Sequence, residues 1–274
     1  SMHIVVCVKM VPDTTQVKID PVTNTLVREG VPFITNPYDT NAVEEALRFK
    51  DKYGAYITAV SMGPPPAESV LRKALSQGVD EAILLSDRAF GGADTLATST
   101  VIGLAIKKID ESRPVDIVFC GKQTIDGDTA QVGPQLAEKL GIPQIAYVEE
   151  VISLSDKTIK AKRAIEGGYE IIESPLPALL TVIDANEPRS ASAKCIMKYK
   201  KAKTRSEIGK LMRDADYTDA QALAVKENEM KAKNLWIHEW DAEKLKADVN
   251  RIGLKGSPTK VKKICLLYTS PSPR

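Results

Sequence analysis

The 274-residue sequence contains only two histidines and four cysteines, and no two cysteines form a C-x-x-C pair. Histidine and cysteine are the usual ligands of zinc, and neither His3 nor His238 has other such residues close to it in the sequence. The same scarcity leaves no histidine to complete a Ser-His-acid or Cys-His catalytic set. The sequence therefore argues against a metal site built on histidine or cysteine and against nucleophilic catalysis.

An excess of charge and a long apolar run are also missing. Lys and Arg number 38 against 36 Asp and Glu, and this balance does not favour nucleic acid or a membrane surface as a partner. No apolar run reaches the length of a membrane span, and the N-terminus lacks the apolar core of a signal peptide. Cys7 and Cys120 lie within apolar runs, where cysteine acts as a small hydrophobic residue. These features predict a cytoplasmic protein without a disulfide framework.

Two common nucleotide-binding motifs are absent as well. The sequence has no G-x-x-x-x-G-K-[ST] phosphate loop and no G-x-G-x-x-G fingerprint. It also lacks the S-G-G-x-D-S turn of ATP pyrophosphatases of related architecture. An enzyme that activates a substrate with ATP is therefore disfavoured.

What is present is a regular alternation of apolar runs and helical patterns. Strands are expected at residues 3–9, 55–63, 81–87 and 115–121. Helices are expected from Asn36, over 68–77, over 95–108 and after Gly133. The alternation predicts an α/β fold with a parallel sheet covered on both faces. In such sheets ligands bind beyond the carboxyl ends of the strands.

The remaining segments have a different texture. A small hairpin is expected at residues 17–30, and β segments follow from about 144, with Gly167-Gly168 at a hairpin turn. Residues 198–205 form a cationic run that we interpret as a solvated or partner-facing surface, because aromatic residues are sparse there.

After Arg189 the chain becomes polar. A helix is expected over 219–231, and Trp236 and Trp240 have the spacing of one helical face. Because this arm has few apolar residues, we expect it to become ordered only against another chain.

The stretch GKQTIDGDTAQVGP at residues 121–134 lies between a strand and a helix. Gly127, Ala130 and Gly133 allow close approach of the backbone to a phosphate, and the following helix points free N–H groups at the loop. The helix dipole adds roughly 0.3–1 kcal/mol at an exposed site. One of Asp126 and Asp128 would cap the helix, and the other would accept a hydrogen bond from ribose or adenine. Since glycine and aspartate are ordinary turn residues, a capped loop without a ligand is the alternative.

Five stretches resemble the β subunit of electron-transfer flavoproteins. They are VCVKMVPD, NPYDTNAVEEALRFKD, VSMGP, GKQTIDGDTAQVGP and NEPRSASAKCIMKYKK. The resemblance covers roughly residues 2–205, and its most specific part is Gly121–Pro134. It weakens over 206–250, which has the character of an insertion.

The resemblance implies a nucleotide-binding, Rossmann-like α/β domain over residues 1–200 with β hairpin excursions. A long arm over residues 201–274 would embrace an α subunit, and we interpret the final stretch 265–274 as foreign to the natural protein. Members of this family take electrons from a flavin-dependent dehydrogenase or NADH and pass them on through flavin. They do so without catalytic residues of their own in this subunit.

Carried over position by position, the resemblance implies an adenine nucleotide pocket in which main-chain groups matter at Cys7 and Met62. The implied pocket residues are Cys7, Asn36, Pro37, Tyr38, Asp39, Met62, Gln123, Thr124, Ile125, Asp126, Gly127, Asp128, Thr129, Ala130, Gln131, Val132 and Gly133. A partner-docking hairpin is implied as well, with contact residues Gly168, Tyr169 and Glu170. Tyr169 stands where family members often have leucine.

The stretch GGADTLAT at residues 91–98 provides a second loop at a helix start. Thr95 and Thr98 are three residues apart, so their hydroxyl groups can point together at a diphosphate. In the alternative, Asp94 only caps the helix and the threonines pack. The pattern resembles the electron-bifurcating family members, which bind FAD, and is absent from the AMP-binding members. The resemblance therefore implies FAD at Asp94, Thr95 and Thr98, with NADH as electron donor and ferredoxin as a possible acceptor.

Two other functions stay open at this point. One is a non-bifurcating β subunit that holds AMP as a structural piece. The other is a stand-alone regulatory protein that binds an adenine nucleotide.

Overall fold

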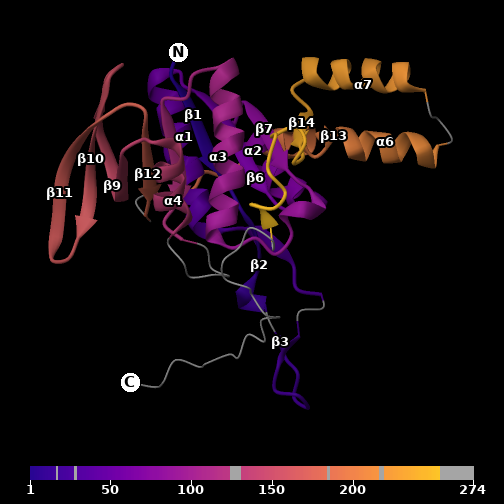
Figure 1. Ribbon diagram of the computed structural model, residues 1–274, viewed down its shortest axis with the longest axis horizontal. Coiled ribbons are helices and arrows are strands. Elements are labelled where there is room, and N and C mark those ends of the chain that lie inside the picture. The colour runs from indigo at the N-terminus through magenta and orange to yellow at the C-terminus, as the bar shows by residue number, and fades with distance from the viewer. Residues whose placement is uncertain (17, 28–29, 124–130, 184–185, 216–218, 254–274) are drawn as a thin grey trace.

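The computed structural model describes residues 1–16, 18–27, 30–123, 131–183, 186–215 and 219–253. Its centre is a ten-stranded sheet with the strand order β11-β10-β9-β12-β8-β1-β6-β7-β14-β13 (Figure 1). The strands from β9 to β13 in this order pair in parallel, whereas β10 pairs antiparallel with both β9 and β11. The prediction of a mostly parallel α/β sheet is confirmed.

The central strands are β1 (His3–Cys7), β6 (Tyr56–Met62), β7 (Glu81–Leu85), β8 (Ile117–Gly121) and β12 (Ala178–Val182). The covering helices are α1 (Pro37–Tyr53), α2 (Glu68–Gln77), α3 (Thr95–Ser112) and α4 (Val132–Leu140). Short 3₁₀ turns occur at η1 (Thr14–Gln16), η2 (Pro65–Ala67) and η3 (Arg88–Phe90). Each predicted strand and helix of this region is present, with ends that differ by a few residues.

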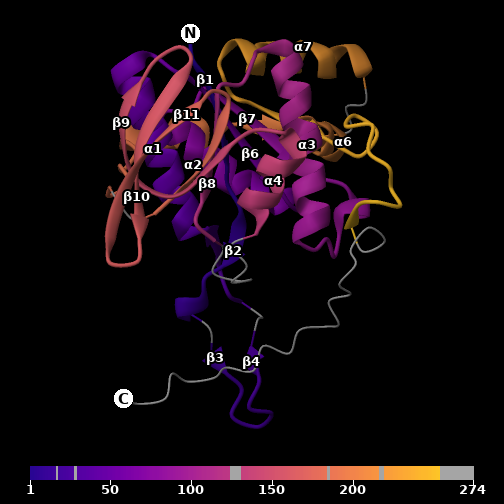
Figure 2. The same cartoon turned by 60° about the vertical axis from the view of Figure 1, so that its left-hand side comes forward.

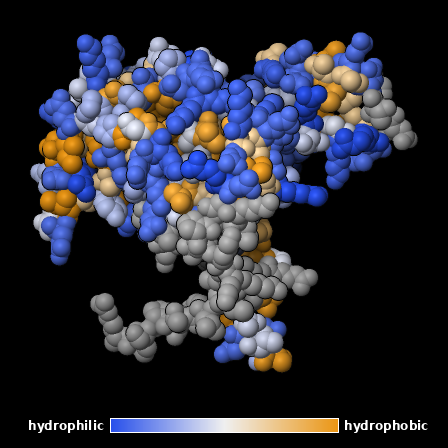
Figure 3. Space-filling model, viewed as in Figure 1, coloured by the Kyte–Doolittle hydropathy of each residue, from blue (hydrophilic) through white to orange (hydrophobic). Residues whose placement is uncertain are grey.

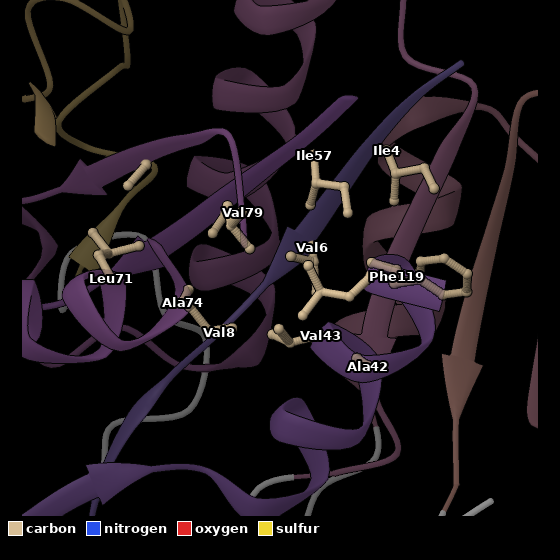
Figure 4. Close-up of a cluster of buried hydrophobic side chains, with 14 of the residues drawn as sticks. Ile4, Val6, Val8, Ala42, Val43, Ile57, Leu71, Ala74, Val79 and Phe119 are labelled. Atoms are coloured by element: carbon tan, nitrogen blue, oxygen red, sulfur yellow. The ribbon is translucent and has the colours of Figure 1, made fainter. Parts of the chain in front are cut away.

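The strands are apolar on both faces because helices cover both faces of the sheet. In β1, Ile4 and Val6 belong to the core under α1 and α2, whereas Val5 belongs to the core under α3 and α4. This alternation follows from the two-residue period of a strand. Figure 4 shows the first core, where Phe119 of β8 lies near Val43 of α1.

The order of the strands reverses beside β1. From β1 the chain passes through α1 to β6 and through α2 to β7 on one side, and α3 then carries it to β8 on the other side. The carboxyl ends of β1 and β8 therefore flank a topological switch point, where open α/β sheets bind ligands.

Two excursions leave the sheet. Between β1 and α1 the chain forms β2 (Met10–Pro12), β3 (Lys18–Ile19), β4 (Leu26–Val27) and β5 (Phe33–Thr35), which extend away from the body (Figure 2). β3 and β4 pair antiparallel, so the predicted hairpin at 17–30 is confirmed. The second excursion comprises β9 (Gln144–Leu154), β10 (Thr158–Ile165) and β11 (Gly168–Pro175), whose turn at Gly167 is also as predicted.

The arm departs from the expectation. It contains α5 (Ala193–Tyr199), β13 (Lys203–Thr204), α6 (Arg205–Asp214), α7 (Ala220–Ala232) and β14 (Trp236–Trp240). Trp236 and Trp240 lie in a strand, not on a helical face, because β7 offers a free edge and β14 pairs with it from His238 to Trp240. Aromatic and β-branched residues suit a strand in this position. The helix predicted at 219–231 is α7.

The arm also packs against its own chain, which corrects the expectation that only another chain could order it. Its few apolar residues are placed where they contact the domain, and Ile208, Leu235 and Ile237 join the core under α1 and α2. Arg72 of α2 adds polar contacts. Its guanidinium donates to Ala202 O at 2.8 Å and contacts Glu68 at 2.8 Å and Glu207 at 2.6 Å.

Among the residues that the structure describes, no helix combines the length and apolar character needed to cross a bilayer.

Candidate functional site

The switch point is built from the start of α1 and the end of β8. Asn36, which is fully buried, donates from its side-chain amide to the Gln123 carbonyl at 2.8 Å. Its main-chain N–H donates to Lys9 O at 2.8 Å. Pro37 occupies the first turn of α1, where its missing N–H has no cost. Asn36 thus joins the segments that leave β1 and β8.

Asp39 makes a second junction at the same place. Its Oδ2 accepts from the Lys9 amide at 2.8 Å, and its carboxyl group also accepts from the Gly121 amide and the Asn36 side chain. Burial raises the pKa of this carboxyl group to about 7, although these hydrogen bonds oppose the rise. Asp39 was predicted as a pocket residue, and its hydrogen bonds place it in the framework of the switch point.

Gly121 explains why β8 can approach α1 so closely. A Cβ at this position would lie 2.7 Å from the Tyr38 carbonyl carbon and 2.8 Å from the Asp39 nitrogen. Gly133 has a similar place in α4, where a Cβ would lie 2.8 Å from the Thr181 methyl group. Both glycines are therefore needed for close packing of backbone at the carboxyl edge.

Cys7 and Met62 end the neighbouring strands β1 and β6, and both are half-buried. The thiol of Cys7 meets that of Cys120 on β8, and this hydrogen bond together with burial raises the pKa of the Cys120 thiol. Next to them, Gln123 Nε2 donates to the Tyr38 hydroxyl at 3.4 Å. The predicted pocket residues up to Gln123 are thus gathered at one edge of the sheet.

The rest of the predicted loop is only partly described. Gln131 and Val132 lie at the start of α4 on the same edge. The positions outside the described residues are Thr124, Ile125, Asp126, Gly127, Asp128, Thr129 and Ala130.

The second predicted loop leads from β7 through η3 into α3. Asp94 caps α3, with Oδ1 accepting from the Ala97 amide at 2.9 Å. Helix capping is the role that the alternative interpretation gave to this residue. Thr95 and Thr98 follow in the first turn and are both half-buried. β7 lies two strands from β1, so this loop is on the same edge as the switch point but is not part of it.

The helices α3 and α4 are neighbours on one face of the sheet. A Cβ at Gly103 of α3 would lie 3.5 Å from the Lys139 Cβ of α4. Because both helices follow parallel strands, their N-termini point to the same edge. The arrangement therefore directs two positive helix ends at one edge of the sheet, which suits an extended anion such as a diphosphate.

Other polar groups lie away from this edge. His3 contacts Thr58 Oγ1 at 2.8 Å and Arg113 O at 3.0 Å at the amino ends of the strands. His238 lies 3.4 Å from Glu81. Within the described ranges, no group of histidine, cysteine, aspartate or glutamate side chains has the arrangement of a metal site.

The predicted docking residues lie on the far hairpin. Gly168 and Glu170 belong to β11, and Glu170 contacts Arg163 at 2.8 Å. Tyr169 is 59% exposed, with the Lys162 ammonium 4.3 Å from its ring centre. These residues are separate from the carboxyl edge.

Comparison with known proteins decides the family. Residues 23–207 match the family described as "Electron transfer flavoprotein domain". The electron transfer flavoprotein subunit beta of Clostridium acetobutylicum is 50% identical, over 96% of this chain and 87% of that protein. The chain belongs to the electron transfer flavoprotein β-subunit family.

Two further relatives of this electron transfer flavoprotein chain have different names. Protein FixA of Azotobacter vinelandii is 45% identical, over 100% of this chain and 85% of that protein. The caffeyl-CoA reductase-Etf complex subunit CarD of Acetobacterium woodii is 53% identical over 72% of this chain and 74% of that protein. The resemblance seen in the sequence is therefore confirmed at the level of the family, whose members are electron-carrying flavoproteins.

Sequence reasoning missed two backbone groups at the switch point. The Lys9 amide and the Gly121 amide both donate to Asp39, and neither position was predicted as part of the pocket. For Gly121, a glycine at the end of a buried strand was the available signal. Lys9 acts through its backbone amide, which any residue except proline could supply, so the residue type gave no signal.

Proposed function

We propose that this chain is an electron transfer flavoprotein β subunit of the electron-bifurcating type and that it binds FAD at the carboxyl edge of its sheet. The neighbouring helices α3 and α4, whose N-termini point to the same edge as the switch point, are the observation that carries the proposal. When bound, FAD would supply the electron transfer. The described residues of this chain bind and orient the nucleotide and act as no acid, base or nucleophile.

The adenosine half would occupy the switch point. Asn36, Asp39 and Gly121 bring the ends of β1 and β8 and the start of α1 together, and the Gln123 carbonyl is held in place by Asn36. Main-chain groups at Cys7 and Met62 line the ends of the neighbouring strands. A rigid backbone frame of this kind fixes the position of a nucleoside without needing a charged side chain.

The diphosphate would extend from there towards α3. Asp94 already caps the helix through one oxygen, which leaves Thr95 and Thr98 in the first turn to donate to phosphate oxygens. AMP has no second phosphate and no flavin, so it would use only the adenosine half. The fit of the Thr95–Thr98 turn to a longer anion favours FAD over AMP at this site.

The β10–β11 hairpin is the proposed docking surface for a flavin-dependent dehydrogenase. Ile165, Tyr169 and Ile171 are exposed there, and Figure 3 shows hydrophobic side chains gathered at the edge formed by these strands. Aromatic residues are common anchors of such interfaces. The arm over residues 201–274 would embrace the α subunit, which holds the other flavin.

NADH is the proposed electron donor and ferredoxin a proposed acceptor.

Cys7, Cys120 and Cys195 carry free thiols, which fits the reducing cytoplasm as the proposed location of the protein. The relative CarD is by its name part of an Etf complex, and the same kind of assembly is proposed for this chain.

The test is the nucleotide content of the heterodimer reconstituted with its α subunit. FAD in both subunits and no AMP supports the proposal, whereas AMP in the β subunit contradicts it. Valine at both Thr95 and Thr98 should lower the affinity for FAD and leave that for AMP unchanged. Thr100→Val is the matched control, because Thr100 lies further along α3 and its hydroxyl donates to Leu96 O at 2.9 Å.

A further inference from the structure

The arm reaches back to the loop that the proposed function assigns to the diphosphate. After β14 the chain runs through Ala242, Leu245 and Ile252, all of which are buried in the core under α3 and α4. Phe90 of the η3 turn is buried in the same core. The last described part of the arm therefore packs against the turn that leads into α3.

Asp87 ties the two segments together by hydrogen bonds. Its Oδ1 accepts from the Ala89 amide at 2.9 Å and so caps the η3 turn. Its Oδ2 accepts from the Ala242 amide of the arm at 3.0 Å. Just before it, the Ser86 amide donates to Trp240 O at 3.1 Å. The start of the loop is thus fixed to the arm at Ser86 and at Asp87.

Gly253 provides a second contact between the arm and the loop. A Cβ at this position would lie 3.2 Å from Gly91 O and 3.0 Å from the Ala89 carbonyl carbon, and closer still to the Ala89 oxygen. Its φ of +62° is also one that other residues rarely adopt. Only glycine allows the arm to lie directly on the Ala89–Gly91 backbone.

We infer that the arm segment 242–253 positions the loop at Gly91–Thr98, so that arm docking and retention of the dinucleotide are coupled. Gly253 and Asp87 are positioning residues in this arrangement, because they act through the loop backbone and not on the ligand. The inference rests on the proposed function, since it concerns the diphosphate half of the same site. The adenosine half lies on β1 and β8, outside these contacts, so the arm should not affect the affinity of that half for its ligand.

The coupling has a simple physical basis. If a disturbed arm leaves the loop in its binding position for only about a tenth of the time, the apparent affinity for FAD falls about tenfold. AMP does not use the loop, so its affinity stays the same. A general loss of stability would instead weaken both ligands together.

Gly253→Ala in the full-length chain, purified with its α subunit and stripped of nucleotide, tests the inference. Gly54→Ala is the matched control, because Gly54 has a similar φ of +68° but no atom within 4 Å of its Cβ position. Ile252→Ala is a milder second variant that keeps Gly253 and weakens the packing on the turn. FAD and AMP are titrated separately into each protein, and amide hydrogen exchange is followed over residues 88–98 without nucleotide.

We expect Gly253→Ala to bind FAD about tenfold more weakly, to keep its affinity for AMP and to exchange faster over 88–98, with Ile252→Ala in the same direction. Equal exchange in the Gly253 and Gly54 variants would overturn the inference, as would an equal loss of both ligands. If the wild-type chain bound AMP but no FAD, that result would contradict the proposed function and not this inference. The exchange over 88–98 would still decide whether the arm positions the loop.

Discussion

Replacement of Asp39 by asparagine tests the buried carboxyl group that joins β1, α1 and β8. The side chain is 7% exposed, and burial raises its pKa from 3.8 to about 7. Asparagine has nearly the same shape, does not ionise, and offers one acceptor oxygen where the carboxylate offers two. The substitution therefore separates the cost of burying a charge from the benefit of the hydrogen bonds.

The pKa shift fixes the direction of the pH dependence. Between 3.8 and about 7 the folded protein keeps a proton on Asp39 that the unfolded chain has released. The free energy of unfolding therefore falls as the pH rises, by about 1.4 kcal/mol per pH unit and about 4 kcal/mol in all. Above about pH 7 this loss is complete and constant. Asp39→Asn avoids this pH-dependent loss of stability because asparagine does not ionise. It leaves one backbone amide without its acceptor, however, at a cost of about 1–3 kcal/mol.

Urea unfolding of both proteins at about pH 5, 6, 7 and 8 measures the difference in stability. We expect the wild type to be more stable at about pH 5, and the variant to gain about 3 kcal/mol relative to it by about pH 8. Asp156→Asn is the control, since Asp156 lies at an exposed turn and should show no such trend. A difference that stays constant from about pH 5 to 8 would refute the assignment of this carboxyl group.

Three further predictions concern packing and the arm. Gly121→Ala should destabilise the chain by about 1–3 kcal/mol and weaken nucleotide binding in titrations, whereas Gly168→Ala, with open space around it, should do neither. Arg72→Met should leave the carboxyl groups of the buried Glu68 and the half-buried Glu207 without the Arg72 guanidinium, at a cost of about 3 kcal/mol, and limited proteolysis should then cut faster within 205–232. Unchanged cleavage would contradict this role of Arg72. Thr204→Ala removes the capping box of α6 and should cost about 1 kcal/mol, seen as a lower midpoint in urea.

The sequence by itself determined the elements of the domain and the edge on which the site lies. Apolar runs such as 3–9 and 115–121 are strands because β-branched residues buried on both faces need helices on either side, and this pattern is local. The carboxyl ends of the strands then meet by the geometry of a parallel sheet. The loops that follow the strands at 3–9, 55–63, 81–87 and 115–121 could therefore be placed on one edge from the sequence alone.

Tertiary structure decided what individual groups do there. Asp39 received its role from the amides of Lys9 and Gly121, which come from different strands and leave no trace in local periodicity. The segment 236–240 became a strand because the edge of β7 was free to pair with it, and a five-residue stretch does not reveal such an edge. Gly253 meets Ala89 only after the whole arm has folded back. Contacts of this kind join residues that are far apart in the chain. They form only when the whole sheet has assembled, because its strand order decides which edges and strand ends come together.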